Sequence, residues 1–284
     1  NLVFGEYDVD ALDGLDAVIL AMPHGASQSV VPELVGRVGV IVDLAADFRL
    51  KDPDLYPRWY GEAHKAPELL GQFAYGLPEL YRSSIVGSTM IAAPGCYPTA
   101  VGLALAPLVR NEVIQTTGVI VNAVSGVSGA GRTLKHSTHF CTVDEDVTAY
   151  GLLDHRHTPE MEQITGAQVL FTPHLVPTNR GILATCYAKP AGSVTTESLL
   201  AVLAREYRND PFMVVRPTSP STKATAGTNC CHLTARYDER TDTVIVISAI
   251  DNLVKGTAGQ AVQCLNLVWG LPEDTGLPKM AAYP

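Results

Sequence analysis

Short apolar runs alternate with one amphipathic segment in the first third of the chain. Residues 15–21, 38–44 and 90–93 are almost continuously apolar, which is typical of strands buried on both faces. Residues 27–35 lie between the first two runs and can form a helix with one apolar side. Strand, helix and strand in this order predict a doubly wound parallel sheet, whose ligands bind beyond the carboxyl ends of the strands.

The pattern changes in the second half, where strands follow one another with few helices between them. The elements that we expect after the third apolar run are helices 99–110, 195–207 and 258–269 and strands 118–124, 168–172, 182–188, 212–216, 230–237 and 243–250. This succession predicts an α+β domain with a mixed, mostly antiparallel sheet, joined to the α/β domain.

Composition narrows the class of protein. The 284 residues are 46% hydrophobic and carry 20 Lys and Arg against 29 Asp and Glu, a net charge of −9. The hydrophobic content supports a folded core, and the negative charge argues against sequence-independent binding of nucleic acid. Six cysteines without a CxxC spacing do not make a disulfide scaffold, and no apolar run is long enough for a membrane span. We expect a cytoplasmic enzyme with no nucleic-acid or membrane partner.

Cys96 is the first candidate for chemistry. It lies in the segment PGCYPTA, residues 94–100, where a buried strand and a Pro-Gly turn lead into the helix predicted at 99–110. Unpaired N–H groups and the dipole at a helix N-terminus favour a thiolate, which is a good nucleophile. Burial as a small apolar side chain is the alternative, and the pattern alone leaves both interpretations open.

The segment HRHTPE, residues 155–160, is the second candidate. A cysteine nucleophile needs a proton-transfer partner, and the imidazole of His155 or His157 suits this role. Arg156 adds a positive charge suited to a carboxylate or phosphate. His-x-His is also a metal-ligand spacing, but no second ligand cluster accompanies it, so we expect no metal. The same residues also fit a loop that caps a helix beginning at residues 158–159.

Two further loops follow predicted strands. The small residues of SGVSGAGR, 125–132, allow close approach of the backbone to an anion, and Arg132 supplies charge. Polar and small residues at 251–261 suit a ligand's amide or phosphate. An ordinary turn and a capped helix explain these two segments equally well. Neither segment is an intact G-x-G-x-x-G dinucleotide fingerprint.

Taken together, the chain resembles the N-acetyl-gamma-glutamyl-phosphate reductase family, within the aspartate-semialdehyde dehydrogenase superfamily. The segments that carry the resemblance are 21–25, 43–50, 75–79, 94–100, 125–132, 155–160, 171–175, 180–183 and 251–260. It implies a Rossmann-like domain in residues 1–98, onto which residues 257–284 pack, and a catalytic and oligomerisation domain in residues 99–256. Family members also have a preceding strand and glycine turn that this sequence lacks, so we expect the chain to be part of a longer protein.

The resemblance implies NADP(H)-dependent reduction of N-acetyl-glutamyl 5-phosphate to N-acetyl-glutamate 5-semialdehyde, in arginine biosynthesis, by a homodimer or homotetramer. Cys96 would displace inorganic phosphate and form a thioester, and hydride transfer would then release the semialdehyde. His155 is the implied acid/base group, with His157 as the alternative. The implied substrate-binding residues are Arg49, Arg132, Arg156, His157, Glu160 and Arg180. The implied cofactor-binding residues are Pro23, His24, Ser125, Gly126, Ser128, Gly129, Ala130, Asn252 and Lys255.

Three alternative functions stay open at this point. The same chemistry on N-acetyl-aminoadipyl phosphate, in lysine biosynthesis, differs only in the shape of the substrate pocket. A cysteine hydrolase with Cys96 and His155 at its centre would cleave thioesters without NADPH. A non-catalytic or regulatory fragment is the third alternative, because the cofactor-binding turn is missing from the sequence.

Overall fold

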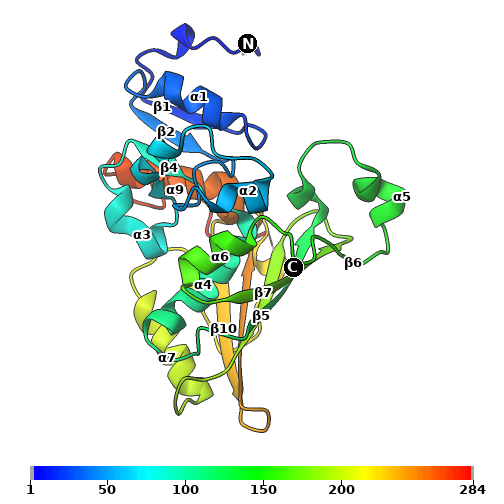
Figure 1. Ribbon diagram of the computed structural model, residues 1–284. Helices are drawn as coiled ribbons and strands as arrows, with labels where there is room; N and C mark the ends of the chain where they lie inside the picture. Colours follow the sequence, from blue (N-terminus) through cyan, green and yellow to red (C-terminus); the bar gives the residue numbers. More distant parts are fainter. Residues whose placement is uncertain (1–2, 283–284) are drawn as a thin grey trace.

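A computed structural model describes residues 3–282 and contains two sheets (Figure 1). The first sheet is parallel throughout, with the strand order β1 (Ala17–Leu20), β2 (Val40–Asp43), β4 (Met90–Ala92) and β3 (Ala74–Tyr75). Helix α1 (Ser27–Leu34) covers the face of the sheet on which Ile41 lies. Helices α3 (Pro78–Ile85) and α9 (Gly259–Val268) cover the opposite face, on which Val42 lies. Burial on both faces explains the continuous apolar runs and confirms the predicted doubly wound sheet.

The second sheet has seven strands. Their order is β6 (Thr148–Ala149), β7 (Val169–Val176), β5 (Val119–Gly126), β8 (Ile182–Ala188), β11 (Thr243–Ile250), β10 (Cys231–Asp238) and β9 (Met213–Val215). The pairs β5–β7 and β10–β9 are parallel and the other neighbours are antiparallel, so the predicted mixed sheet is confirmed. One face packs on α4 (Cys96–Arg110) and α7 (Thr196–Glu206), while Ile120 and Leu170 are 40% and 50% exposed on the other.

Helix α4 follows β4 directly and joins the two sheets. It is buried along most of its length and packs against α6 (Thr158–Thr165), where a Cβ atom on Gly102 would come within 2.8 Å of Ile164. The helix begins at Cys96 and not at Thr99, where the sequence pattern placed its start. The difference arises because Pro98 is compatible with the first helical turn, where no backbone N–H is needed for the helix.

Residues 131–149 form a segment, here called the flap, that projects from the body of the molecule (Figure 1). The flap contains η4 (His136–Thr138), α5 (Phe140–Val143) and β6, and Leu134 is 99% exposed. The other short elements are η1 (Asp10–Leu12), α2 (Leu55–Tyr60), η2 (Pro67–Gln72), η3 (Val127–Ala130), α8 (Thr222–Thr225) and η5 (Val254–Ala258). Within residues 3–282, no helix has the length and apolar character needed to cross a membrane.

Candidate active site

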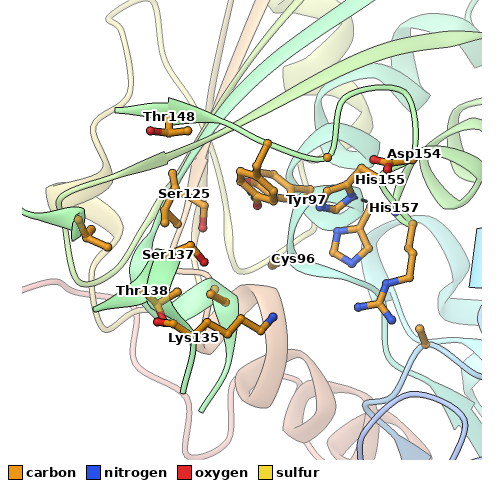
Figure 2. Close-up of a pocket in the computed structure, with 18 of the residues that line it drawn as sticks. Cys96, Tyr97, Ser125, Lys135, Ser137, Thr138, Thr148, Asp154, His155 and His157 are labelled. Carbon is orange, nitrogen blue, oxygen red and sulfur yellow. Dashed lines mark hydrogen bonds between the residues drawn. The ribbon is translucent and has the colours of Figure 1, made fainter. Parts of the chain in front are cut away.

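A cavity of about 800 Å³ lies where the carboxyl ends of the parallel strands, the N-terminal ends of α4 and α6, and the flap meet (Figure 2). Parallel strands leave such a crevice at their carboxyl ends, so the position agrees with the topology of the first sheet. The predicted site residues that line it are Cys96, His155, His157, Arg49, Arg156, His24, Ser125, Gly129 and Ala130. Residues from widely separated segments of the sequence therefore share one cavity.

Cys96 is the first residue of α4, directly after Gly95. Burial raises the pKa of its thiol to about 11, and the N–H groups of Tyr97 and Cys96 and the Arg49 charge offset only part of this effect. The helix terminus thus acts in the predicted direction, but burial outweighs it. At neutral pH the sulfur carries its proton, so a nucleophilic attack requires a neighbouring proton acceptor.

Two imidazoles lie beside the thiol, in the loop that leads into α6 (Figure 2). The backbone N–H of His157 donates to Nδ1 of His155 (3.1 Å), so a neutral His155 carries its proton on Nε2. Burial and Arg156 lower the pKa of His155 to about 4, and burial with His155 and Arg49 holds the pKa of His157 well below its usual range. Both imidazoles are therefore neutral at pH 7.

His157 lies closer to the backbone that carries the thiol than its position in the sequence suggests. A Cβ atom on Gly95 would come within 2.5 Å of its Nε2, so only glycine leaves room for this ring. His157 also lines a smaller cavity of about 160 Å³ together with Cys96 and Gly256, and His155 does not. This geometry places His157 nearer to Cys96 than the spacing of the two histidines alone could show.

Glu160 and Arg49 form the buried support beneath the cavity. The Glu160 carboxylate accepts hydrogen bonds from the Tyr75 hydroxyl (2.6 Å) and the Gly95 N–H (2.9 Å), and lies 3.6 Å from Arg49 Nη1. Arg49 also donates to the Ala93 carbonyl (2.7 Å). These contacts fix the turn between β4 and α4, and they leave Arg49 largely committed to groups within the protein.

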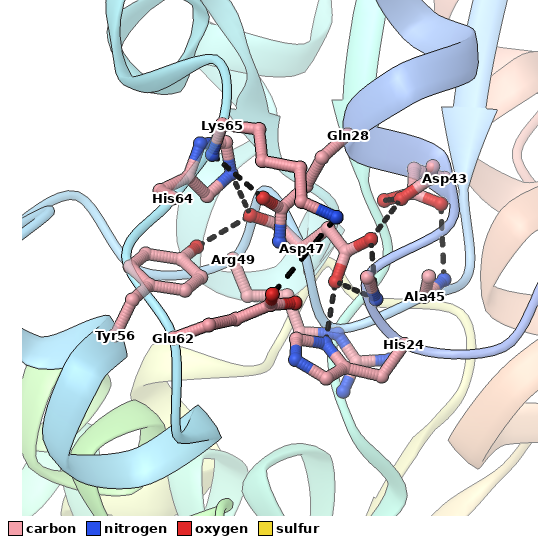
Figure 3. A network of polar contacts seen from close by, with 12 residues as sticks. His24, Gln28, Asp43, Ala45, Asp47, Arg49, Tyr56, Glu62, His64 and Lys65 are labelled. Carbon is pink, nitrogen blue, oxygen red and sulfur yellow. Dashed lines mark hydrogen bonds and ion pairs between the residues drawn. The ribbon is translucent and has the colours of Figure 1, made fainter.

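His24 is held at the cavity by a buried carboxylate (Figure 3). Asp47 lies 2.5 Å from Nδ1 of His24 and accepts hydrogen bonds from Gly25 N–H (2.9 Å) and Ser27 Oγ (2.7 Å). Burial raises the pKa of Asp47, but these three partners more than compensate and keep it below its usual range. The ring of His24 packs on Tyr60 with 4.4 Å between centroids, so its orientation is fixed.

Part of the cavity wall is the glycine-rich turn that follows β5. A Cβ atom on Gly129 would come within 2.7 Å of Ser125 Oγ, so a side chain does not fit there. Asn252 fixes the turn, because its amide donates to Ser128 Oγ (3.0 Å) and accepts from the Gly181 N–H (2.8 Å). The turn thus presents backbone rather than side chains, which suits the close approach of a flat or anionic ligand group.

The other predicted residues do not line the cavity, namely Pro23, Gly126, Ser128, Arg132, Glu160, Arg180, Asn252 and Lys255. Arg132 is exposed on the flap. Arg180 pairs with Asp251 at 3.1 Å. Lys255 is fully buried and its Nζ lies 2.6 Å from Glu79. The charges of Arg180 and Lys255 are therefore compensated within the protein.

The flap lines the cavity with residues that the sequence did not indicate, namely Lys135, Ser137, Thr138, Thr142, Val143, Asp146 and Thr148. Lys135 extends its side chain toward the part of the cavity that holds Cys96 (Figure 2). No regular hydrophobic period marks this segment, because little of it is buried. Its polar side chains gave no signal of a site in the sequence alone.

Comparison with known proteins defines the class. Residues 1–88 match a family model described as semialdehyde dehydrogenase, NAD binding domain, and residues 96–252 match one described as semialdehyde dehydrogenase, dimerisation domain. The fold also resembles aspartate semialdehyde dehydrogenase II from Vibrio cholerae, with a TM-score of 0.69, 16% identity, and coverage of 92% of this chain and 81% of that one. The protein is an oxidoreductase of the semialdehyde dehydrogenase class, which uses a nicotinamide cofactor.

Closer relatives define the family. The chain is 48% identical over 286 residues to an N-acetyl-gamma-glutamyl-phosphate reductase of Symbiobacterium thermophilum, covering 98% of this chain and 82% of that protein. It is 49% identical over 277 residues to the protein of that name from Desulforamulus reducens, covering 95% and 80%. The chain belongs to the N-acetyl-gamma-glutamyl-phosphate reductase family, so the resemblance inferred from the sequence motifs is confirmed.

Proposed function

We propose that this enzyme reduces N-acetyl-glutamyl 5-phosphate to N-acetyl-glutamate 5-semialdehyde with NADPH, as a step of arginine biosynthesis. The observation that carries the proposal is the position of Cys96, at a helix N-terminus beside two neutral imidazoles in a cavity of about 800 Å³. The names of the relatives support the substrate.

In the first step the Cys96 sulfur attacks the acyl carbon while its proton passes to an imidazole, and phosphate leaves to give a thioester. A neutral thiol and a neutral imidazole make this transfer simultaneous with attack, because neither group is charged beforehand. We assign the transfer to His157 because its ring packs over Gly95 and shares the smaller cavity with Cys96. The backbone N–H of His157 donates to Nδ1 of His155 and so orients the His155 ring, and His155 stays the alternative prediction for the acid/base group.

The residues around the cavity fit a dinucleotide. The turn of Ser125, Gly129 and Ala130 presents backbone to the cavity, and Nε2 of His24 is buried with no hydrogen-bond partner within the described chain, while Nδ1 pairs with Asp47. A bound NADPH supplies the hydride that reduces the thioester carbonyl. The residues of this chain hold the thioester near the cofactor and exclude water from it. They also return a proton to the Cys96 sulfur as the thiohemiacetal collapses.

The anionic groups of the substrate meet few uncommitted cations. Arg156 and Lys135 line the cavity, whereas Arg49 already contacts Glu160 and two backbone carbonyls. We assign the substrate carboxylate to Arg156 and the phosphate to Lys135, with Arg49 supporting the turn before Cys96. Arg132, Arg180 and Glu160 act, in this proposal, outside direct contact with substrate.

The domain boundaries and the oligomer are part of the proposal. A Rossmann-like domain of residues 1–98 and 257–284 holds the cofactor, and residues 99–256 form the substrate and oligomerisation domain. The half-exposed face of the seven-stranded sheet, with Ile120 and Leu170, lies within the residues matched by the dimerisation model, which supports a homodimer or homotetramer. Cross-linking or light scattering measures this state.

Phosphate-dependent reduction of NADP⁺ tests the activity. Full-length enzyme, N-acetyl-glutamate semialdehyde and inorganic phosphate should give a rise in absorbance at 340 nm that disappears without phosphate. Replacing NADP⁺ by NAD⁺ measures the cofactor specificity. Replacing N-acetyl-glutamate semialdehyde by N-acetyl-aminoadipate semialdehyde measures the specificity for the length of the substrate. Folded enzyme that produces no absorbance change would contradict the proposal, and thioester cleavage without cofactor would support a cysteine hydrolase instead.

A further inference from the structure

The backbone behind Cys96 has an unusual geometry. Element η5 (Val254–Ala258) is a turn of π-helix, in which the N–H groups of Gly256 and Ala258 bond to carbonyls five residues earlier. A Cβ atom on Gly256 would come within 2.8 Å of the Cβ atom of Cys96, so this turn lies directly against the nucleophile. Single π-helical turns inside helices are frequent at functional sites and are less stable than α-helix. Such a turn therefore needs support from its surroundings.

The support is a fully buried ion pair. Lys255 in η5 and Glu79 in α3 are both 0% exposed, with 2.6 Å between Nζ and Oε1. Gln263 accepts a second hydrogen bond from the Lys255 ammonium (2.9 Å) and donates to Glu79 (3.1 Å). Burial raises the pKa of Glu79, but Lys255 and Gln263 more than compensate, so this carboxylate stays ionised. Burying two charges is costly, and a buried pair is weak evidence for stability alone.

The strand and turn before Glu79 also reach the other side of Cys96. The Tyr75 hydroxyl donates to Glu160, which in turn accepts the N–H of Gly95. The Gly76 carbonyl accepts a hydrogen bond (2.8 Å) from Gln260, the second residue of α9, which directly follows η5. Residues 75–79 are thus tied to the residue before Cys96 and to the turn behind it. A change in either connection reaches the thiol through backbone contacts.

We propose that Lys255 and Glu79 are positioning residues for the Cys96 thiol, acting through Gly256 of the π-helical turn. The inference rests on the proposed function in taking Cys96 as the nucleophile. It gives Lys255 a role behind the sulfur in place of contact with the cofactor. The pair fixes the sulfur relative to His157, so its loss lowers the rate of the chemical step while substrate binding persists.

Variants of the pair separate positioning from stability. Displacement of reacting groups by about 1 Å costs about 10²-fold in rate, so Lys255→Met should lower kcat by about that factor and leave KM within about twofold. The double variant Lys255→Met/Glu79→Met removes both charges and should recover Tm but not kcat. Arg82→Gln is the matched control: Arg82 is also on α3 and pairs with Asp210 and Glu273, both at 2.7 Å, and its link to Lys255 runs only through Glu273 and Gln263. It should lower Tm and keep kcat.

A second readout does not depend on turnover. In a Cys141→Ser background the exposed cysteine is removed, and iodoacetamide then reports on Cys96, because the other four cysteines are buried. Alkylation should be faster in Lys255→Met and unchanged in Arg82→Gln. Two results would overturn the proposal. One is recovery of both Tm and kcat in the double variant, and the other is a parental kcat and a parental alkylation rate in Lys255→Met. If Lys255→Met does not fold, the isosteric Glu79→Gln variant takes its place in both assays.

The outcome is distinguishable from failure of the proposed function. An inactive parent enzyme contradicts the assigned reaction, yet the alkylation rates still report whether the pair positions the thiol. An active enzyme with unchanged rates in all pair variants contradicts the positioning role alone.

Discussion

The base of the cavity and the flap differ in how firmly the fold holds them. The base consists of Cys96, His157, Arg49 and Glu160, and here the charged groups are buried and paired with each other and with backbone. The flap, in contrast, exposes most of its side chains and buries little beyond Val143. Local opening costs least where few apolar contacts exist. Under the proposed function, bond making falls to the buried base and substrate capture to the exposed flap.

Cys96→Ser is the strongest test of the base. A serine hydroxyl is a far weaker nucleophile, so turnover should fall by about 10⁴-fold or more while the fold is retained. Phosphate-dependent NADP⁺ reduction measures the effect, and Cys141→Ser on the flap is the control that should keep full activity. Near-parental turnover in Cys96→Ser would contradict the thioester mechanism. It would also contradict the proposal that the chemical step takes place at the base of the cavity.

His157→Asn tests which of the two imidazoles exchanges a proton with Cys96 at the base of the cavity. Loss of an acid/base group should lower kcat by about 10²- to 10⁴-fold, and His155→Asn should lower it less. Because the pKa of His155 is about 4 and that of His157 is well below its usual range, the acid limb of kcat/KM should lie below pH 6.5. The opposite ranking of the two variants would return the role to His155, and an acid limb near pH 6.5 would contradict buried, neutral imidazoles.

Glu160→Gln tests whether buried charge pairing supports the base. The substitution keeps the shape of the side chain but leaves the Arg49 charge buried without a carboxylate, which should cost about 3 kcal/mol of unfolding free energy. Chemical denaturation measures the loss. Arg240→Gln, which breaks an exposed pair with Asp238, should leave the midpoint unchanged. Equal effects of the two variants would contradict the contrast between buried and exposed regions.

Lys135→Gln tests the flap as the part that captures substrate. Removal of one charge-assisted contact should raise KM for inorganic phosphate in the oxidative direction by about tenfold, with kcat nearly unchanged. Lys65→Gln is the control, because Lys65 lies outside the cavity and pairs with Glu62. A drop in kcat with constant KM would instead indicate that Lys135 acts in the chemical step and not in substrate binding.

Leu134→Ala should have the smallest effect. The side chain is 99% exposed on the flap, so the free energy of unfolding should stay within about 0.5 kcal/mol of the parent. Leu103→Ala, in the fully buried middle of α4, should cost about 2–5 kcal/mol. Thermal or chemical unfolding compares the two. A large loss of unfolding free energy in Leu134→Ala would show that Leu134 is buried in solution against another part of the protein or a second copy of it.

The sequence predicted the base better than the flap for a physical reason. Strands and α4 bury their side chains with a regular period, so the pattern of residues 90–110 carried both the fold and the candidate Cys96. The flap buries little and has no period, so Lys135 gave no signal. The pair of Lys255 and Glu79 joins residues 176 positions apart, which no local pattern shows. The raised pKa of Cys96 follows from three-dimensional burial and was equally out of reach.

The packing of α4 on α6 has a mechanical consequence. Cys96 begins one helix, His157 precedes the other, and Gly102 lets the two helices approach until its backbone touches Ile164. Sulfur and imidazole are therefore carried by two helices in direct contact. Their spacing is set by that contact, so a movement of the flap on its own would leave the sulfur and the imidazole aligned.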